Sequence, residues 1–599
     1  MQPRLRALLI TLVAAISAIA LAACGSDDDS SGVSGDDFAP TTEAPGDAVE
    51  GGSLDVISAG FFDYLDPGAA FYNYTYVFTN AAHRGLMGWQ PGDEGEPSPD
   101  LASDDPEISD DLRTVTFTLR DGVMFSPPVD REVTSADVKY AIERTLLPGV
   151  ENAYTASYMD LVEGFPKAQK AVREDDTVAP DISGIETPDD KTIVFNLTEG
   201  YGEVLVQALT LPASAPVPEE YAKEFDAESP STYDTHQVTT GPYMIENNAE
   251  GETTGYSPGK ELKLIRNPNW DPETDYRPAY LDEITFREGF TDVNSAFTRI
   301  LEGESQINGD ILPTPAALKL SAQEFPAQLE LAPSGGNRYV ALNTQLPPFD
   351  DINVRKAMLA GADREAMRLA RGGELVGPIA THFIPPGVPG FEEAGGLEGA
   401  GLDFMASPEG DPDLAAQYMQ DAGYDSGKYE GDEKILMVAE NAGIDKEVGE
   451  VVLQQFQDLG FDVEFRQVNS NIMYTKFCSV PKAEVAVCPN VGWVKDFNDP
   501  QAMLDPTFNG ENIEPTANSN WPQLDVPEIN EQMDEAALIG DIEERAEVWG
   551  DLDTQVMEQA PAIPYVWDDQ GNVRSPDVRG VINLSNGQWD IAYTSLAAE

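Results

Sequence analysis

The alternation of apolar and polar side chains predicts several strands along the chain. In Thr114–Arg120 the residues Val115, Phe117 and Leu119 share one face, and the threonines share the other. The run Thr192–Leu197 alternates in the same way. Both runs are predicted to be strands with one face on a core and one toward solvent.

A longer segment, Tyr339–Arg364, predicts a strand that leads into a helix. Tyr339 and Asn343 point to the same side of the strand, because side chains alternate along it. Two consecutive prolines end the strand. From Val354 onward, apolar or small residues recur at i, i+3, i+4 and i+7, which is the spacing of one helix face.

Two further patterns predict helices beside strands. Thr134–Leu146 has a threonine suited to cap a helix and apolar residues at helical spacing. In the second half of the chain, Lys434–Glu440 and Phe461–Phe465 read as strands around a helix at Lys446–Leu459. A strand–helix–strand unit of this kind makes part of the sheet parallel.

Length and charge narrow the class of protein. At 599 residues the chain exceeds one hydrophobic core, so two or three domains are expected. The 106 acidic and 36 basic side chains give a formal charge of −70, which argues against binding nucleic acid. Two interpretations of the charge stay open: an acidic surface that keeps the protein soluble, or a field that attracts cationic ligands.

The amino terminus has the features of a bacterial lipoprotein signal. Arg4 and Arg6 precede an apolar stretch, Leu8–Leu21, which is short for a membrane span and typical of a signal peptide. The letters LAAC ending at Cys24 resemble a lipobox, in which the cysteine carries the lipid. The alternative is an ordinary secretory signal. The polar stretch Gly25–Gly52 predicts a disordered tether.

Cys478 and Cys488 are the two other cysteines. In an oxidising compartment they are expected to form a disulfide, which would stabilise the fold by roughly 2–3 kcal/mol. Two free thiols are the alternative. The spacing excludes a CxxC motif.

Three blocks resemble one known family. They are the run Phe117–Leu146, the segment Tyr339–Arg364 and the motif VGWVKDFNDP at Val491–Pro500. Together they resemble the bacterial extracellular solute-binding proteins of family 5, the oligopeptide- and dipeptide-binding receptors of ABC importers. The blocks stand in family order, and the one departure noted, Pro127-Pro128 in place of Asp-Gly, lies in a surface turn.

The resemblance implies an α/β, bilobal fold like that of type II periplasmic binding proteins, of the large class with an extra domain, in which mixed sheets are joined by a two-stranded hinge. It divides the chain into a signal peptide (1–23), a tether (24–52), a first part of lobe I (53–93), the extra domain (94–205), a second part of lobe I (206–332), lobe II (333–540) and a return to lobe I (541–599).

The resemblance also implies site residues. Asp496 would pair with the ligand α-ammonium, although it could instead serve only its own turn. Trp493 would form an apolar wall or a core anchor, and Gly492 would let the backbone approach the ligand. Tyr339 and Asn343 would lie along a strand that pairs with extended peptide, or pack in the interior.

Two loops complete the expected site. Tyr64 lies in an aromatic stretch that runs past the cleft in the family, and His382 lies in another loop that approaches the ligand. Between Gly372 and Pro389 there is no Lys or Arg, which favours longer peptides or another solute over dipeptides.

The expected function is therefore capture of oligopeptides by hinge closure and delivery to the permease and ATPase subunits of an importer. The protein is expected to be a monomer without a cofactor. A metal site is not expected either, because His83, His236 and His382 are scattered along the chain. Alternatives are the same fold binding an oligosaccharide, an opine, a metal chelate such as nickel, or haem, and a receptor that signals or chaperones. An enzyme is not expected, because GxSxG, Walker A, HExxH and GxGxxG motifs are missing.

Overall fold

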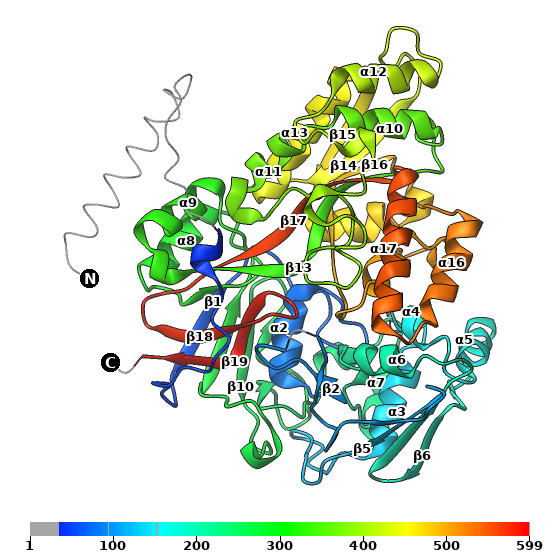
Figure 1. Ribbon diagram of the computed structural model, residues 1–599. Helices are drawn as coiled ribbons and strands as arrows, with labels where there is room; N and C mark the ends of the chain where they lie inside the picture. Colours follow the sequence, from blue (N-terminus) through cyan, green and yellow to red (C-terminus); the bar gives the residue numbers. More distant parts are fainter. Residues whose placement is uncertain (1–34, 94, 151, 153, 598–599) are drawn as a thin grey trace.

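A computed structural model describes residues 35–93, 95–150, 152 and 154–597. The chain forms two lobes and an additional domain, and two long strands connect the lobes (Figure 1). The predicted signal peptide and lipidation site, Cys24, lie outside the described residues.

Lobe I is built on a mixed sheet. β1 pairs in parallel with β11 and with β12, whereas β10 pairs antiparallel with β11 and β8. Alternate residues of these strands, such as Leu262 and Leu264, are fully buried beneath the helix α2 (Asn73–Ala82) and its neighbours. The strands are β12 (Ile307–Asn308), β1 (Ser53–Ile57), β11 (Glu283–Arg287), β10 (Glu261–Arg266) and β8 (Tyr243–Ile245), with β9 (Tyr256–Ser257) paired to β10.

The additional domain is a separate antiparallel sheet with its own core. Val115 and Phe117 are fully buried, as their alternation predicts, and the Phe117 ring packs edge-on against Phe195 at 6.0 Å. The helix α3 (Ser135–Arg144) begins with a capping box, in which Thr134 and Asp137 satisfy each other's backbone N–H groups. The strands are β4 (Glu107–Ile108), β5 (Thr114–Thr118), β7 (Thr192–Asn196) and β6 (Ile185–Asp189).

Lobe II contains the predicted strand–helix–strand unit. β14 and β15 are parallel, and α13 (Gly443–Asp458) connects them and buries Val448, Val452 and Phe456. The sheet order is β15 (Asp462–Val468), β14 (Lys434–Glu440), β16 (Val487–Val494), β13 (Leu329–Leu342) and β17 (Ala562–Val573). Helices cover it, among them α10 (Ile352–Gly361), α11 (Arg364–Arg371), α12 (Pro412–Asp421), α16 (Pro527–Ala537) and α17 (Ile542–Glu558).

The long strands β13 and β17 form the connection between the lobes. They run antiparallel and side by side (Figure 1), and their lobe I ends pair Leu329 with Val573. At their other ends Ala341 pairs with Ala562, inside the lobe II sheet. The helix α17 packs in the same core cluster as the lobe II sheet, and β17 then runs from that sheet to lobe I.

The stretch that precedes β1 is in contact with the fold. Residues 24–52 are predicted to be a disordered tether, yet Phe38 is buried in the main core and the Thr41 backbone bonds to both Glu330 and Ile582. The burial of Phe38 and the hydrogen bonds of Thr41 hold this part of the stretch against the fold, which composition alone does not reveal.

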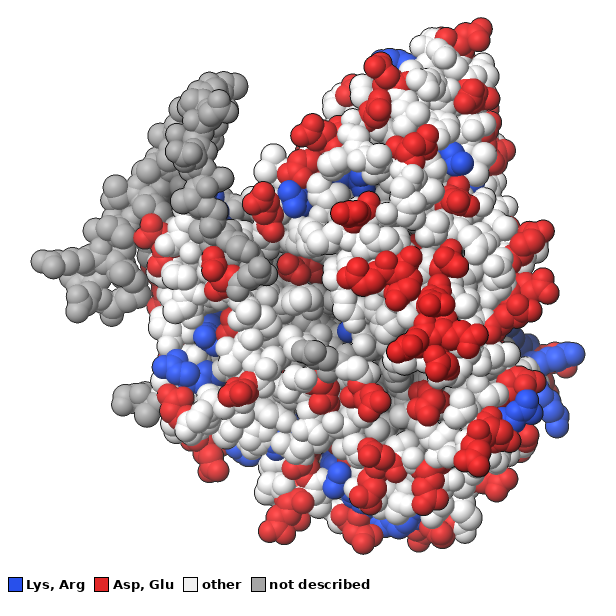
Figure 2. Space-filling model, in the orientation of Figure 1, with Lys and Arg blue, Asp and Glu red and all other residues white. Residues whose placement is uncertain are grey.

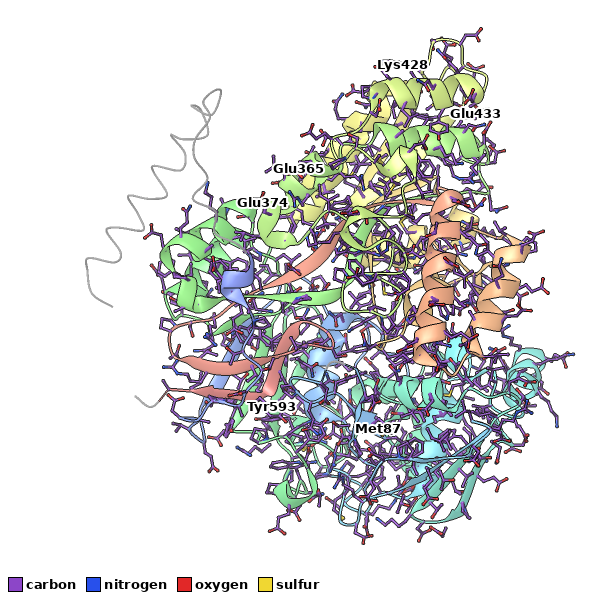
Figure 3. All side chains as sticks on the ribbon, viewed as in Figure 1. Met87, Glu365, Glu374, Lys428, Glu433 and Tyr593 are labelled. Atoms are coloured by element: carbon purple, nitrogen blue, oxygen red, sulfur yellow. A yellow bond between two sulfur atoms is a disulfide. The ribbon has the colours of Figure 1, made fainter. Side chains whose placement is uncertain are left out.

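Acidic side chains cover much of the face seen in Figure 2, and basic ones are few. Lys428 and Glu433 lie at the far tip of lobe II, and Tyr593 and Met87 lie in the lower half of the view in Figure 3.

In the described part of the chain, none of the helices has both the length and the apolar content that crossing a bilayer requires.

Candidate functional site

The two lobes turn the carboxyl ends of their parallel strands toward each other. On lobe I, β1 leads into the loop that carries Tyr64 and Tyr72, and Asp310 follows β12. On lobe II, Glu440 ends β14 and Asp496 follows β16. Crevices outside the carboxyl ends of strands are where open α/β sheets bind ligands. We call the region where these residues of the two lobes meet the inter-lobe cleft.

Asp496 bridges this cleft through one hydrogen bond. The Tyr158 hydroxyl, on α4 (Thr155–Met159) of the additional domain, donates to the Asp496 carboxylate. Asp496 is half-buried, and in the described part of the chain no Lys, Arg or His pairs with it. Burial raises the pKa of Asp496 to about 7, against the effect of the Tyr158 hydrogen bond. The carboxylate is therefore held at the cleft without a cationic partner.

Asp499, the second aspartate of the motif Val491–Pro500, is buried and has a cationic partner. Asp499 is 5% exposed and makes a bidentate ion pair with Arg545, at 2.6 and 2.8 Å. Arg545 also donates to the last two backbone carbonyls of α16 and to the Ile539 carbonyl in the link to α17. Asp499 thus fixes the loop, and Asp496 is left available for a ligand.

Gly492 and Trp493, which belong to the same motif as Asp496, precede it on β16. A Cβ atom on Gly492 would lie 2.7 Å from Cδ of Arg338, so the glycine makes room for that arginine. Trp493 is half-buried, donates from Nε1 to the Ala502 carbonyl at 2.7 Å and stands edge-on to Trp521. Tyr64 is half-buried in the loop after β1.

Three of the predicted ligand residues lie in the interior. Tyr339 and Asn343 are 0% and 2% exposed, and Asn343 donates to the Val485 carbonyl. His382 is 1% exposed, with Nδ1 at 2.9 Å from Asp553, and it packs against Trp567. In this conformation these three side chains present no surface to a solute.

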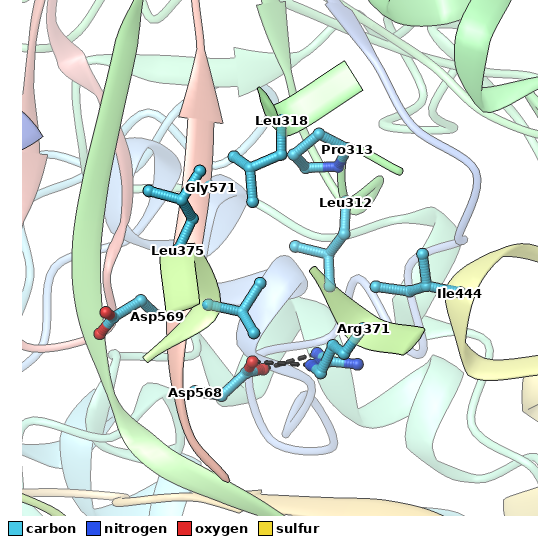
Figure 4. A pocket seen from close by; sticks show the side chains of 10 residues that line it. Leu312, Pro313, Leu318, Arg371, Leu375, Ile444, Asp568, Asp569 and Gly571 are labelled. Atoms are coloured by element: carbon cyan, nitrogen blue, oxygen red, sulfur yellow. Dashed lines mark hydrogen bonds and ion pairs between the residues drawn. The ribbon is translucent and has the colours of Figure 1, made fainter. Parts of the chain in front are cut away.

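An ionic network lies next to the cleft on lobe II. Arg371 donates to Asp568 at 2.6 and 2.7 Å and to Asp445 at 3.0 Å, and Arg338 Nε lies 3.3 Å from Asp568. Figure 4 shows Arg371 and Asp568 at the wall of a small recess, lined on its apolar side by Leu312, Pro313, Leu318 and Ile444. No group of three or more metal-ligating side chains occurs among the described residues.

Cys478 and Cys488 form the predicted disulfide. Cys478 ends the short helical segment Tyr474–Cys478, and Cys488 lies in β16. The bond therefore ties the segment that carries Tyr474 to the strand that leads to Asp496.

Several side chains at the cleft were not predicted from the sequence: Tyr158, Arg338, Asp310 and Glu440. Arg338 precedes Tyr339, and strand alternation alone would have indicated that the two face opposite sides. The other three carry no local signal, because loops far apart in the sequence bring them together.

Comparison with known proteins identifies the class. Residues 96–515 match the sequence profile of the bacterial extracellular solute-binding proteins, family 5 (middle region), and the chain belongs to that family. The chain is 25% identical to the heme-binding protein A of Haemophilus influenzae over 499 residues, 81% of this chain and 82% of that one. It is 24% identical over 502 residues to the oligopeptide-binding protein OppA of Bacillus subtilis, 83% and 84% of the two chains.

Among solved structures, the clavulanic acid biosynthesis oligopeptide binding protein 2 superposes with a TM-score of 0.77 at 27% identity, over 93% of this chain and 97% of that one. The predicted α/β, bilobal fold is thereby confirmed.

Proposed function

We propose that this protein is the solute-binding receptor of an ABC importer and that it captures oligopeptides by their amino terminus. The observation that carries the proposal is the Asp496 carboxylate, which lies between the lobes without a cationic partner among the described residues. An α-ammonium group is shared by peptides of every sequence, so one carboxylate can serve them all. Two relatives whose names state peptide binding support this solute class.

Binding would be coupled to motion at the hinge. Strands β13 and β17 connect the lobes, and Asp496 of lobe II already contacts Tyr158 of the additional domain. A solute that bridges the same surfaces would favour the closed arrangement over the open one. The permease and ATPase subunits would then recognise the closed, loaded receptor.

Native mass spectrometry of the purified protein tests the solute class. Retained peptides, or binding of added tri-alanine or tetra-alanine to the protein, would support the proposal. A retained mass that matches haem, a saccharide or an opine would identify that compound as the solute in place of a peptide.

The pH dependence of binding follows from the raised pKa of Asp496. The carboxylate must be ionised to pair with an ammonium group, and its pKa is about 7 in the empty protein. The affinity for tri-alanine is therefore expected to rise about tenfold per pH unit between pH 5 and pH 6.5, to level off near pH 7, and to fall above about pH 8 as the peptide amino group loses its proton. Titration calorimetry measures this, and Asp496→Asn should make the profile nearly flat.

Lipid anchoring at Cys24 is part of the proposal. The lipobox-like sequence that ends at Cys24 supports it. Cys24→Ser is expected to move the protein from the membrane fraction to the medium or the soluble extracytoplasmic fraction. Sedimentation of that variant with membranes, to the same extent as the parent, would contradict anchoring.

A further inference from the structure

One aromatic ring of lobe II is buried in the core of the additional domain. Phe497 directly follows Asp496 in the loop between β16 and α15 (Gln501–Phe508), and its side chain is completely buried. It belongs to the same apolar core cluster as Phe195 of the additional domain. The Tyr158 ring on α4 stands edge-on to it, with the ring centroids 4.8 Å apart. Phe497 therefore packs across the boundary between lobe II and the additional domain.

The contact between the two parts extends beyond this one ring. Ala502, on α15, is also completely buried in the core cluster of the additional domain. In the link between α16 and α17, a Cβ atom on Gly540 would lie 2.7 Å from Cδ1 of Leu112, between β4 and β5. At the exposed rim, Arg173 of the additional domain and Glu514 of lobe II form an ion pair at 3.0 Å. An apolar centre with a polar rim is the usual anatomy of a protein interface.

Tyr158 contacts two consecutive residues of the lobe II loop. Its hydroxyl donates to the Asp496 carboxylate, and its ring packs against Phe497. Water can replace the hydrogen bond when the lobes separate. Water cannot replace the contact between the rings, and exposing a buried aromatic side chain is unfavourable. The Phe497 ring is therefore the stronger of the two links.

The strands that connect the lobes contain an irregularity at which they can bend. Between Pro333 and Asn337, β13 has three residues where β17 has one, so the pairing register shifts. Gly335, in the middle of this stretch, has φ +66°. Extra residues of this kind interrupt the ladder of hydrogen bonds locally. A bend here would move lobe II, and Phe497 with it, relative to the additional domain.

We infer that Phe497 is a latch of the closed receptor: its ring docks into the additional domain and sets the ratio of closed to open molecules. The additional domain then has a role of its own, which is to receive lobe II when the cleft shuts. This inference goes beyond the proposed function, because the latch would act on any solute held between the lobes. Asp496 and Phe497 are consecutive, so capture of a solute at Asp496 and docking of the ring reinforce each other.

The distance between two spin labels tests the latch. The labels are attached at exposed positions on the two sides, through Lys170→Cys on α5 (Phe165–Glu174) and Glu531→Cys on α16. Without added solute, the labelled parent is expected to show a short-distance population. Phe497→Ala should lower the ratio of short to long distances by at least about tenfold, because it removes a buried ring. Phe497→Leu, which keeps an apolar side chain, should give an intermediate ratio.

Two control variants separate the latch from other causes. Tyr158→Phe removes the hydrogen bond to Asp496 and keeps the ring, so it should change the distance ratio much less than Phe497→Ala does. Phe117→Leu loosens the core of the same domain at a ring pair within that domain, with Phe195, and should leave the ratio within about twofold. Thermal unfolding followed by circular dichroism checks that each variant is folded.

Solute kinetics give a second readout. With tri-alanine, Phe497→Ala is expected to raise the dissociation rate constant at least about tenfold and to leave the association rate constant within about threefold. The latch is overturned if the parent lacks the short-distance population, if Phe497→Ala leaves the distance ratio unchanged, or if Phe117→Leu changes it equally; the proposed function then still stands. If tri-alanine does not bind the parent, peptide capture is overturned, and the distance ratio alone decides on the latch.

Discussion

Asp496→Ala is expected to weaken binding of peptides with a free amino terminus by about 2–5 kcal/mol, or roughly 30- to 5,000-fold. Asp496 has no cationic partner among the described residues, where its carboxylate accepts a hydrogen bond from the neutral Tyr158 hydroxyl. Removing it strands the ligand ammonium in a partly desolvated cleft. Titration calorimetry at pH 7 with tri-alanine measures the loss.

Acetylation of the peptide amino terminus provides the control. The parent protein should lose most of its affinity for the acetylated peptide, and Asp496→Ala should no longer distinguish the two forms. Glu374→Ala, which removes an exposed carboxylate from a surface turn, should bind both peptides as the parent does. Equal affinity of the parent for free and acetylated peptides would refute the role of Asp496.

Arg545→Met is expected to lower the free energy of unfolding by about 3–5 kcal/mol, because it leaves the buried Asp499 carboxylate without its partner. Both side chains are almost completely buried, and the pair ties the Asp496 loop to α16 and α17. Urea unfolding followed by tryptophan fluorescence measures the shift of the transition.

An exposed ion pair serves as the comparison. Arg173 and Glu514 lie 3.0 Å apart with side chains 60% and 47% exposed. Arg173→Met should cost less than about 1 kcal/mol. The double variant Arg545→Met with Asp499→Leu should regain much of the loss, since no buried charge remains. A shift for Arg545→Met as small as that for Arg173→Met would show that the buried pair does not hold the loop.

The strands and helices with strong periodicity were predictable from the sequence. Val115 and Phe117 are buried as their alternation indicates, and Thr134 caps its helix. These features depend on neighbours within a few residues, which a sequence displays directly. Phe38 shows the limit, because its burial depends on a core that forms from distant segments.

The site was predictable only in part. The family motif located Asp496, but its partner Tyr158 lies 338 residues away in the sequence. Alternation would place Tyr339 and Arg338 on opposite faces of β13, but it does not show which one approaches the cleft. Residues on both faces of β13 are buried, so alternation alone does not distinguish the face toward the cleft from the face toward the core. Asp310 and Glu440 follow strands of different lobes, so the effect of Asp310 on the pKa of Glu440 depends on the folded arrangement.

A crystal structure of the protein with its bound solute tests the central claim most directly. The account predicts a primary amine of the solute within about 3.2 Å of an Asp496 carboxylate oxygen, enclosed between the two lobes. A solute bound elsewhere, with Asp496 contacted only by Tyr158, would contradict it.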